Sequence, residues 1–306
     1  MEYYVVKYSD QTVTDYCIEH KIALMLSYYA DKNSAYKNFL EPRKKRLEQG
    51  LENGKLFMDS GAFTAWTKGA VINVDEYCKY INEYGEYVDH FGQLDTIPKV
   101  GASITETAEA ARKTLDNYFE MISKVKYPEK ITYTFHVGEP EEILREALTW
   151  GAQHKDIMKT IAIGGLVRKN SVNKNSVISR VFNVIRELYP EVKVHLFGCT
   201  SKQYFLDYPA HSGDSSNHIM SAINGHVNTP GGLIGFGEKK IKKHYSNLRH
   251  DEKEVVDKYL QEIGFTAEML FEDSKNRVLA NIKYIEREYY QKNFRKENKY
   301  KSGRLF

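Results

Sequence analysis

Apolar and polar positions alternate with two different periods along most of this chain. Short runs rich in β-branched and aromatic residues are separated by longer segments in which apolar residues recur at helical spacing. The strand-like runs are Tyr3–Tyr8, Ile22–Ser27, Lys55–Met58, Tyr87–Leu94, Ile131–Phe135, Thr160–Ile163, Val192–Phe197 and a run around Tyr208–Gly213. The clearest helical patterns are Val74–Tyr84, Thr105–Val125, Glu141–Trp150 and Val177–Leu188. Repeated strand and helix predict a parallel sheet with helical crossovers.

The number of strand-like runs, about eight, is that of a closed (β/α)8 barrel. We therefore predict an α/β fold in which residues 1–250 form a TIM-like catalytic barrel. A doubly wound open sheet is the alternative, because periodicity does not show whether a sheet closes on itself.

Two segments depart from the alternation. Ile223–Glu238 contains Pro230-Gly231-Gly232, a turn sequence that predicts a hairpin excursion from the barrel. Residues 251–306 have apolar residues at helical spacing and many basic residues, so we predict a helical, basic C-terminal extension. Within it, Gly264 is a plausible end of one helix and Thr266 a plausible N-cap of the next.

The net charge of +3 is too small to identify a nucleic-acid-binding protein by itself. The basic residues are nevertheless clustered, first in the run Lys239, Lys240, Lys242 and Lys243. A second group lies at the C-terminus and alternates with aromatic residues: Tyr289, Tyr290, Lys292, Phe294, Arg295, Lys296, Lys299, Tyr300, Lys301 and Arg304. Such groups suit a phosphate backbone and unstacked bases, although a solvated helix face has the same pattern.

The three cysteines, Cys17, Cys78 and Cys199, are widely spaced and never form a Cys-x-x-Cys motif. This pattern argues against a disulfide framework and against a cysteine zinc site, and it favours reduced thiols in a cytoplasm. The first residues lack the features of a signal peptide, and no apolar run reaches the length of a membrane span. We expect a cytoplasmic protein that needs no metal and no cofactor.

Ionisable or small residues follow nearly every strand-like run. Ligands of barrels and open α/β sheets bind at the carboxyl ends of the strands, so these residues are the candidates for the site. They are Asp59, Asp95, His136 with Glu139, Gly164-Gly165, Gly198 and Asp214. Two carboxylates across one pocket are the minimum needed to break and remake a glycosidic bond, since one attacks the sugar carbon and the other moves the proton.

Each carboxylate also has a simpler interpretation. Asp59 and Asp214 both lie next to serine and glycine, where an aspartate can cap a turn or a helix. Asp95 precedes Pro98 and can be a turn residue. In a binding role, Asp95 would accept hydrogen bonds from the ring N–H and the amino group of guanine.

The residues after the next two strands are also open to two interpretations. His136 is either a donor that faces a ligand or a core histidine. Glu139 is predicted to cap the helix that begins at Pro140. The amides of Gly164 and Gly165 either bind a base carbonyl at close range or form a tight turn.

Together these segments resemble the tRNA-guanine transglycosylase superfamily, and among its members the phage-type enzymes that insert 7-deazaguanines into DNA. The likeness covers roughly residues 55–220, with the motifs in family order. The motifs are Asp59-Ser60-Gly61 with Phe63, Asp95, His136-Val137-Gly138-Glu139, Ala162-Ile163-Gly164-Gly165-Leu166, His195-Leu196-Phe197-Gly198 and Asp214-Ser215-Ser216.

The resemblance implies a (β/α)8 barrel and a base-exchange reaction. By this likeness Asp214 is the nucleophile, Asp59 the general acid and base, and Asp95 the residue that reads the guanine edge. The remaining substrate-binding residues that the resemblance implies are Ser60, Gly61, Phe63, His136, Gly164, Gly165, Leu166 and Gly198. The implied partners are a nucleic acid, contacted by Lys239, Lys240, Lys242 and Lys243, and a free 7-deazaguanine base such as preQ0.

The chain departs from the tRNA-modifying members in three respects. It has no cysteine after Cys199, so the zinc site that those members carry behind the nucleophile is missing. It lacks a recognisable additional RNA-binding domain. Ala62 replaces the second glycine after the Asp-Ser pair. The first two departures favour DNA over tRNA as the substrate.

Several alternatives stay open. The same chemistry on tRNA, a hydrolase in which water replaces the incoming base, and a non-catalytic nucleic-acid-binding barrel all fit parts of the pattern. A Schiff-base lyase or aldolase fits less well, because it needs a lysine at the carboxyl end of a strand. Lys55, Lys130 and Lys193 instead begin their strands.

Overall fold

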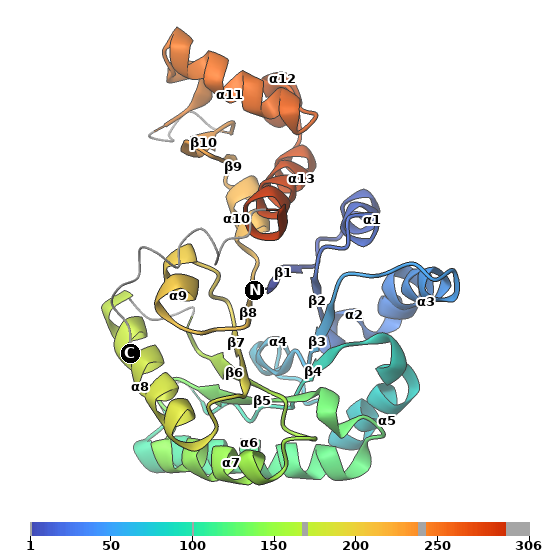
Figure 1. Ribbon diagram of the computed structural model, residues 1–306, viewed down its shortest axis with the longest axis vertical. Coiled ribbons are helices and arrows are strands. Elements are labelled where there is room, and N and C mark those ends of the chain that lie inside the picture. Colours follow the sequence, from blue (N-terminus) through green and yellow to red (C-terminus); the bar gives the residue numbers. More distant parts are fainter. Residues whose placement is uncertain (1, 100, 167–170, 238–242, 292–306) are drawn as a thin grey trace.

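The computed structural model describes residues 2–99, 101–166, 171–237 and 243–291. Its centre is a closed barrel of parallel strands in the order β1 to β8 (Figure 1). The strands are β1 (Glu2–Val6), β2 (Leu24–Ser27), β3 (Leu56–Asp59), β4 (His90–Gly92), β5 (Ile131–His136), β6 (Thr160–Gly164), β7 (Lys193–Leu196) and β8 (Ser212–Ser215). Because β1 pairs with both β2 and β8, the sheet closes on itself. The predicted α/β barrel is confirmed, and the open-sheet alternative is wrong.

Helices follow the strands and surround the barrel (Figure 1). They are α1 (Gln11–Glu19), α2 (Tyr28–Ala35), α3 (Glu41–Glu48), α4 (Ala62–Thr67), α5 (Val74–Tyr84), α6 (Ile104–Lys124), α7 (Glu141–Gln153), α8 (Ser171–Leu188), α9 (Lys202–Asp207) and α10 (Asn217–Ile223). Local chemistry fixes where α6 begins. The Ser103 hydroxyl accepts from the Glu106 amide at 3.1 Å, and the Glu106 carboxylate accepts from the Ser103 amide at 2.8 Å. This reciprocal cap satisfies two donors that the first turn leaves free.

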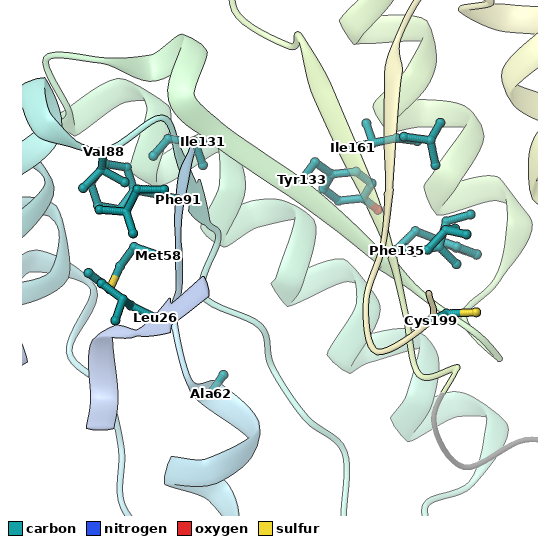
Figure 2. Packing of buried hydrophobic residues seen from close by; sticks show 14 of the residues in the cluster. Leu26, Met58, Ala62, Val88, Phe91, Ile131, Tyr133, Phe135, Ile161 and Cys199 are labelled. Atoms are coloured by element: carbon teal, nitrogen blue, oxygen red, sulfur yellow. The ribbon is translucent and has the colours of Figure 1, made fainter. Parts of the chain in front are cut away.

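Side chains along each strand alternate between the helices outside and the barrel interior. Leu26, Met58 and Phe91 face outward from three neighbouring strands and lie near one another in Figure 2. Tyr4 and Phe57 face inward and belong to a separate cluster inside the barrel. Full burial of such a side chain stabilises a fold by about 1.5–3 kcal/mol, so both faces of the sheet contribute to stability.

A hairpin and the C-terminal helices form a second apolar cluster beyond one side of the barrel (Figure 1). Its elements are β9 (His226–Thr229), β10 (Gly232–Gly235), α11 (His250–Glu262), α12 (Ala267–Glu272) and α13 (Ser274–Ile285). The hairpin predicted around Pro230 is confirmed by the antiparallel pairing of β9 with β10. Thr266 caps α12 as predicted, since its hydroxyl accepts from the Met269 amide. The division of the chain at residue 250 stays a prediction.

Two polar side chains of α13 join this second cluster to the barrel. The Asn281 side-chain amide donates to the carbonyls of His218 at 3.1 Å and His226 at 3.2 Å, and its oxygen accepts from the Asn228 amide at 2.7 Å. The Arg277 guanidinium donates to carbonyls in α10 and α12 at 2.8 and 2.6 Å. Both side chains are buried, and these bonds satisfy backbone groups that would otherwise be costly to bury.

One strand lies later in the chain than predicted. The run around Tyr208–Gly213 was expected to be the last strand of the barrel, but β8 spans Ser212–Ser215. The reason is that α9 continues to Asp207, and the register of β8 with β1 extends to the pair of Ser215 and Val5. Asp214 therefore lies within the strand instead of in the loop after it.

Candidate active site

The carboxyl ends of β3, β4, β5 and β6 surround a cavity of about 450 Å³. Seven of the residues predicted for the site line it: Asp59, Phe63, Asp95, His136, Glu139, Gly164 and Gly165. Barrel enzymes bind their substrates at this end of the strands. The volume falls within the range of about 300–1,000 Å³ that is usual for small-molecule sites.

Asp59 is the last residue of β3 and lines the cavity. Burial raises the pKa of Asp59 from its ordinary value of 3.8 to about 7, and the negative charges of Asp95 and Asp214 add to the effect. The Gly61 amide donates to Oδ2 at 3.0 Å, which partly offsets the rise. A carboxyl group with a pKa near neutrality can deliver a proton and take one back, so Asp59 is suited to acid–base chemistry.

The turn after Asp59 depends on glycine. Gly61 has a φ of 74°, in the left-handed region, and a Cβ at this position would lie 2.3 Å from the Ser27 hydroxyl oxygen. Ser60 is fully buried, and its hydroxyl accepts from the Ala62 amide at 3.4 Å. Ser60 and Gly61 thus shape the turn that carries Asp59 and are not among the described residues that line the cavity.

His136 lies between two carboxylates at the end of β5. Its Nε2 is 3.3 Å from Asp95 Oδ2, and its Nδ1 is 3.1 Å from Glu139 Oε1. Burial alone would lower the pKa of His136, but the charges of Asp95 and Glu139 and their hydrogen bonds raise it well above 6.5. The ring is therefore an imidazolium at neutral pH that donates to both carboxylates.

Glu139 does not cap α7, so that prediction is wrong. Its Oε2 accepts from the His136 amide at 2.9 Å and its Oε1 faces the His136 ring, so both oxygens fold back on β5. Pro140 itself occupies the N-cap position, and α7 begins without a side-chain cap. Glu139 instead orients His136 above the cavity.

Gly164 provides the space that His136 needs. The register of β5 with β6 pairs these two residues, and a Cβ on Gly164 would lie 2.5 Å from His136 Cδ2. Any larger residue at this position would have to push the ring away. Neither interpretation drawn from the sequence, a tight turn or amides that bind a base carbonyl, included this close packing of Gly164 against the His136 ring.

Asp214 lies in β8 with 7% of its surface exposed. Its Oδ1 accepts from the Gly198 amide at 2.9 Å and is 3.2 Å from His195 Nε2. Asp214 is not among the described residues that line the cavity, yet its charge contributes to the raised pKa of Asp59. The fold thus brings the two predicted catalytic carboxyl groups within electrostatic reach of each other, and it brings Gly198 to Asp214.

The other predicted binding residues are placed as follows. Phe63 lines the cavity, is 47% exposed, and has its ring 5.9 Å from that of Trp66. Leu166 is fully buried and is not one of the described lining residues. Lys243 is exposed, with Nζ 3.4 Å from the Gly231 carbonyl oxygen. Lys239, Lys240 and Lys242 lie outside the described residues.

Of the basic and aromatic C-terminal group, the structure describes Tyr289 and Tyr290. The Tyr289 hydroxyl donates to the Thr200 carbonyl at 3.1 Å, and the Tyr290 hydroxyl accepts from the Ala23 amide at 3.0 Å. Both rings are partly buried and pack against the barrel. Residues 292–306, which carry the basic members of the group, lie outside the described residues.

Three residues near the site were given no role from the sequence, although two of them, His195 and Phe197, belong to a motif that carries the resemblance. Phe197 lines the cavity, and its ring contacts those of Phe57 and His195 inside the barrel. Gln93 is buried beside Asp95, with Nε2 3.4 Å from Asp95 Oδ1. His195 contacts Asp214. The alternation of residues along β7 could have indicated that His195 and Phe197 share the inner face.

His218, in α10, has a structural function. Its Nε2 donates to the Val6 carbonyl at 3.0 Å and ties α10 to β1. Burial lowers the pKa of His218 to about 4, so the ring is neutral.

No protein-family model and no curated protein matches this chain, so the geometry of the site carries the functional argument. Within the part of the chain that the structure describes, no cluster of three or more His, Cys, Asp and Glu side chains is placed to hold a metal ion. Among those same residues, no helix is both long and apolar enough to cross a bilayer. The arrangement provides a proton donor and acceptor in a cavity at the carboxyl ends of the strands, and a second carboxylate, held by hydrogen-bond donors, within electrostatic reach of it.

Proposed function

We propose that the protein is a guanine transglycosylase that exchanges guanine in DNA for a free 7-deazaguanine base such as preQ0. One observation carries the proposal. Two carboxyl groups that act on each other electrostatically lie at β3 and β8, and their surroundings differ. Asp59 holds a proton near neutrality, whereas Asp214 has two donors aimed at one oxygen. Carboxyl groups in contrasting environments are typical of enzymes that cleave glycosidic bonds.

In the first half-reaction, a carboxylate oxygen of Asp214 attacks C1′ of the target nucleotide. A C–O bond forms while the C1′–N9 bond breaks, and its electron pair stays with the departing guanine. Asp59 donates the proton that makes this base neutral. A covalent glycosyl–aspartate intermediate remains.

In the second half-reaction, the Asp59 carboxylate takes the N9 proton of the incoming 7-deazaguanine. The N9 electron pair attacks C1′, the C–O bond to Asp214 breaks, and both carboxyl groups return to their initial states. Two displacements at one carbon retain its configuration. The target nucleotide has to leave the base stack to reach the barrel.

Asp95 and His136 supply the recognition of the base in this proposal. A carboxylate accepts from both the ring N–H and the amino group of guanine, and adenine does not offer this pair of donors. The imidazolium of His136 holds Asp95 through its contact at 3.3 Å, which fixes the carboxylate for that task. The backbone of Gly164 and Gly165 lines the same cavity, where it can contact the carbonyl or the 7-substituent.

Three lysines considered for the Schiff-base alternative lie at the wrong ends of their strands, and Lys7, which follows β1, is paired with Asp31 at 2.6 Å and is not one of the described cavity-lining residues. Lys55 directly precedes β3, Lys130 directly precedes β5 and Lys193 begins β7. Lys130 is also engaged, since its Nζ donates to the Val88 carbonyl at 2.8 Å. These three lysines lie at the amino ends of their strands, away from the cavity.

Base exchange tests the proposal directly. Labelled guanine is incubated with the protein and, separately, with duplex DNA, single-stranded DNA and unmodified tRNA, and label retained in each polymer is counted. Asp214→Ala is the inactive control, and Asp116→Asn, an exposed carboxylate on α6, is the matched control that should stay active.

Label that enters DNA with the intact protein and not with Asp214→Ala would support the proposal. Label in tRNA alone would show that tRNA is the substrate of the same base exchange. Abasic sites without label would indicate a hydrolase. Denaturing electrophoresis should also show a covalent protein–polymer adduct that Asp214→Ala lacks. Absence of label, adduct and base release with every polymer would reject glycosyl transfer.

A further inference from the structure

His195 lies inside the barrel, directly beneath the predicted nucleophile. The register of β7 with β8 pairs His195 with Ser212. Because side chains alternate along a strand, Asp214 lies two residues further on the same inner face of β8. The imidazole therefore stands between a hydroxyl on one side and a carboxylate on the other.

Both ring nitrogens of His195 have partners. Nδ1 is 2.9 Å from the Ser212 hydroxyl oxygen, and Nε2 is 3.2 Å from Asp214 Oδ1. The side chain has no exposed surface. Its ring centroid is 5.0 Å from that of Phe57 and 4.7 Å from that of Phe197. A side chain so enclosed has little freedom to take another orientation.

The chemistry of the partners determines which nitrogen carries hydrogen. An ionised carboxylate only accepts, so Nε2 has to be the N–H that faces Asp214. A hydroxyl both donates and accepts, so Ser212 can give its hydrogen to the lone pair of Nδ1. In this arrangement the ring carries one hydrogen, on Nε2, and each ring nitrogen has one hydrogen-bond partner.

The same geometry distinguishes the two oxygens of Asp214. Both hydrogen bonds that the described residues make to this carboxylate, from His195 and from the Gly198 amide, reach Oδ1. Oδ2 is left for bond formation. Holding one oxygen fixes the rotation of the carboxylate and aims the other.

We propose that His195 is a positioning residue, whose tautomer is set by Ser212 and which holds Oδ1 of Asp214 so that Oδ2 attacks the sugar carbon. The inference rests on the proposed base exchange for the attack itself. The hydrogen-bond direction from Ser212 through His195 to Asp214 does not depend on the substrate, so it can be tested separately.

The first test compares two substitutions of similar size at this position. His195→Gln keeps an N–H donor near the place of Nε2, whereas His195→Leu removes it. In base exchange, His195→Leu should lower kcat roughly a hundredfold, as the loss of one preorganised donor does elsewhere. The KM for the free base should stay within about twofold, because His195 is not one of the described cavity-lining residues. His195→Gln should recover most of kcat.

Equal kcat values for His195→Leu and His195→Gln, with similar unfolding midpoints, would overturn the positioning role. A purely structural role would instead lower stability and activity in parallel in both variants. If the wild-type protein exchanges no base, the proposed function fails, and the hydrogen-bond assignment is decided by the second test.

The second test reads the tautomer of His195 by nitrogen NMR on protein labelled in histidine. The His195 signals are those missing from the spectrum of His195→Gln. We expect a neutral ring with hydrogen on Nε2 and a hydrogen-bonded lone pair on Nδ1, and a mixture of tautomers in Ser212→Ala. A wild-type ring that carries hydrogen on Nδ1 alone, or on both nitrogens, would overturn the assignment.

Discussion

Replacing Asp59 by asparagine should stabilise the fold above neutral pH while it removes base exchange. Burial first, and then the charges of Asp95 and Asp214, raise the pKa of Asp59 from 3.8 to about 7. The difference between these values corresponds to about 4 kcal/mol, since each pKa unit is about 1.4 kcal/mol. Asp59 keeps some contact with solvent, so we expect about half of this energy, roughly 2 kcal/mol.

The direction of the pH dependence follows from proton binding. The unfolded chain releases the Asp59 proton near pH 3.8, whereas the folded protein keeps it until about pH 7. Between these values the folded state binds more protons, so wild-type stability falls relative to Asp59→Asn as the pH rises. Above about pH 7 the gap between the two proteins should be constant.

Denaturant unfolding at about pH 4.5 and about pH 8 measures this gap. Asp59→Asn should be close to the wild type at the lower pH and more stable at the higher one. Asp116→Asn on the exposed face of α6 is the control and should show no pH-dependent difference. An equal gap at both pH values, or a less stable Asp59→Asn at pH 8, would refute the reasoning.

Four further perturbations test other parts of the structure. His136→Gln should lower the free energy of unfolding by about 2 kcal/mol near pH 6, because it removes the imidazolium between two carboxylates. The loss should shrink as the pH rises through the raised pKa of His136, since the wild-type ring then loses its charge, and denaturant unfolding at several pH values measures this. Gly164→Ala should cost about 1–3 kcal/mol and slow base exchange, because its Cβ meets the His136 ring at 2.5 Å. Asn281→Leu should cost about 2–4 kcal/mol in the same unfolding assay and leave kcat unchanged well below the unfolding temperature. Charge reversal of the basic run should weaken nucleic-acid binding and reduce the dependence of the affinity on salt; the run comprises Lys239, Lys240, Lys242 and Lys243. Binding titrations at several salt concentrations measure both effects.

The elements that the sequence predicted best have strong local signals. The helix expected at Val74–Tyr84 has these bounds in α5, because Asn73 caps its first turn and its apolar residues recur on one face. Asp59 and His136 were placed correctly at strand ends for a similar reason: each follows a run of buried residues and precedes a turn.

The parts of the site that the sequence did not predict depend on register. Local patterns cannot show that His195 pairs with Ser212, since this depends on how β7 and β8 align in the closed barrel. Glu139 was expected to cap a helix, because an acidic residue before Pro140 is typical of a helix start. Its carboxylate instead binds the amide and the ring of His136, three residues earlier, and only the folded turn brings these two groups together.

Glu286 and Tyr290, which follow α13, contact the first strands and helix of the barrel, and this affects how the protein folds during synthesis. The Tyr290 hydroxyl accepts from the Ala23 amide and donates to the Tyr3 carbonyl. Glu286 binds Tyr16 of α1 and His20, the residue after α1, and the contact with Tyr16 spans 270 residues of sequence. β1 leaves the ribosome well before its partner β8 and before Glu286 and Tyr290, which follow much later in the sequence. Until then β1 has an unpaired edge, which is a site for wrong pairing and aggregation. We therefore expect closure of the barrel to be a slow step that follows the synthesis of β8 and of the helix α13 that precedes Glu286.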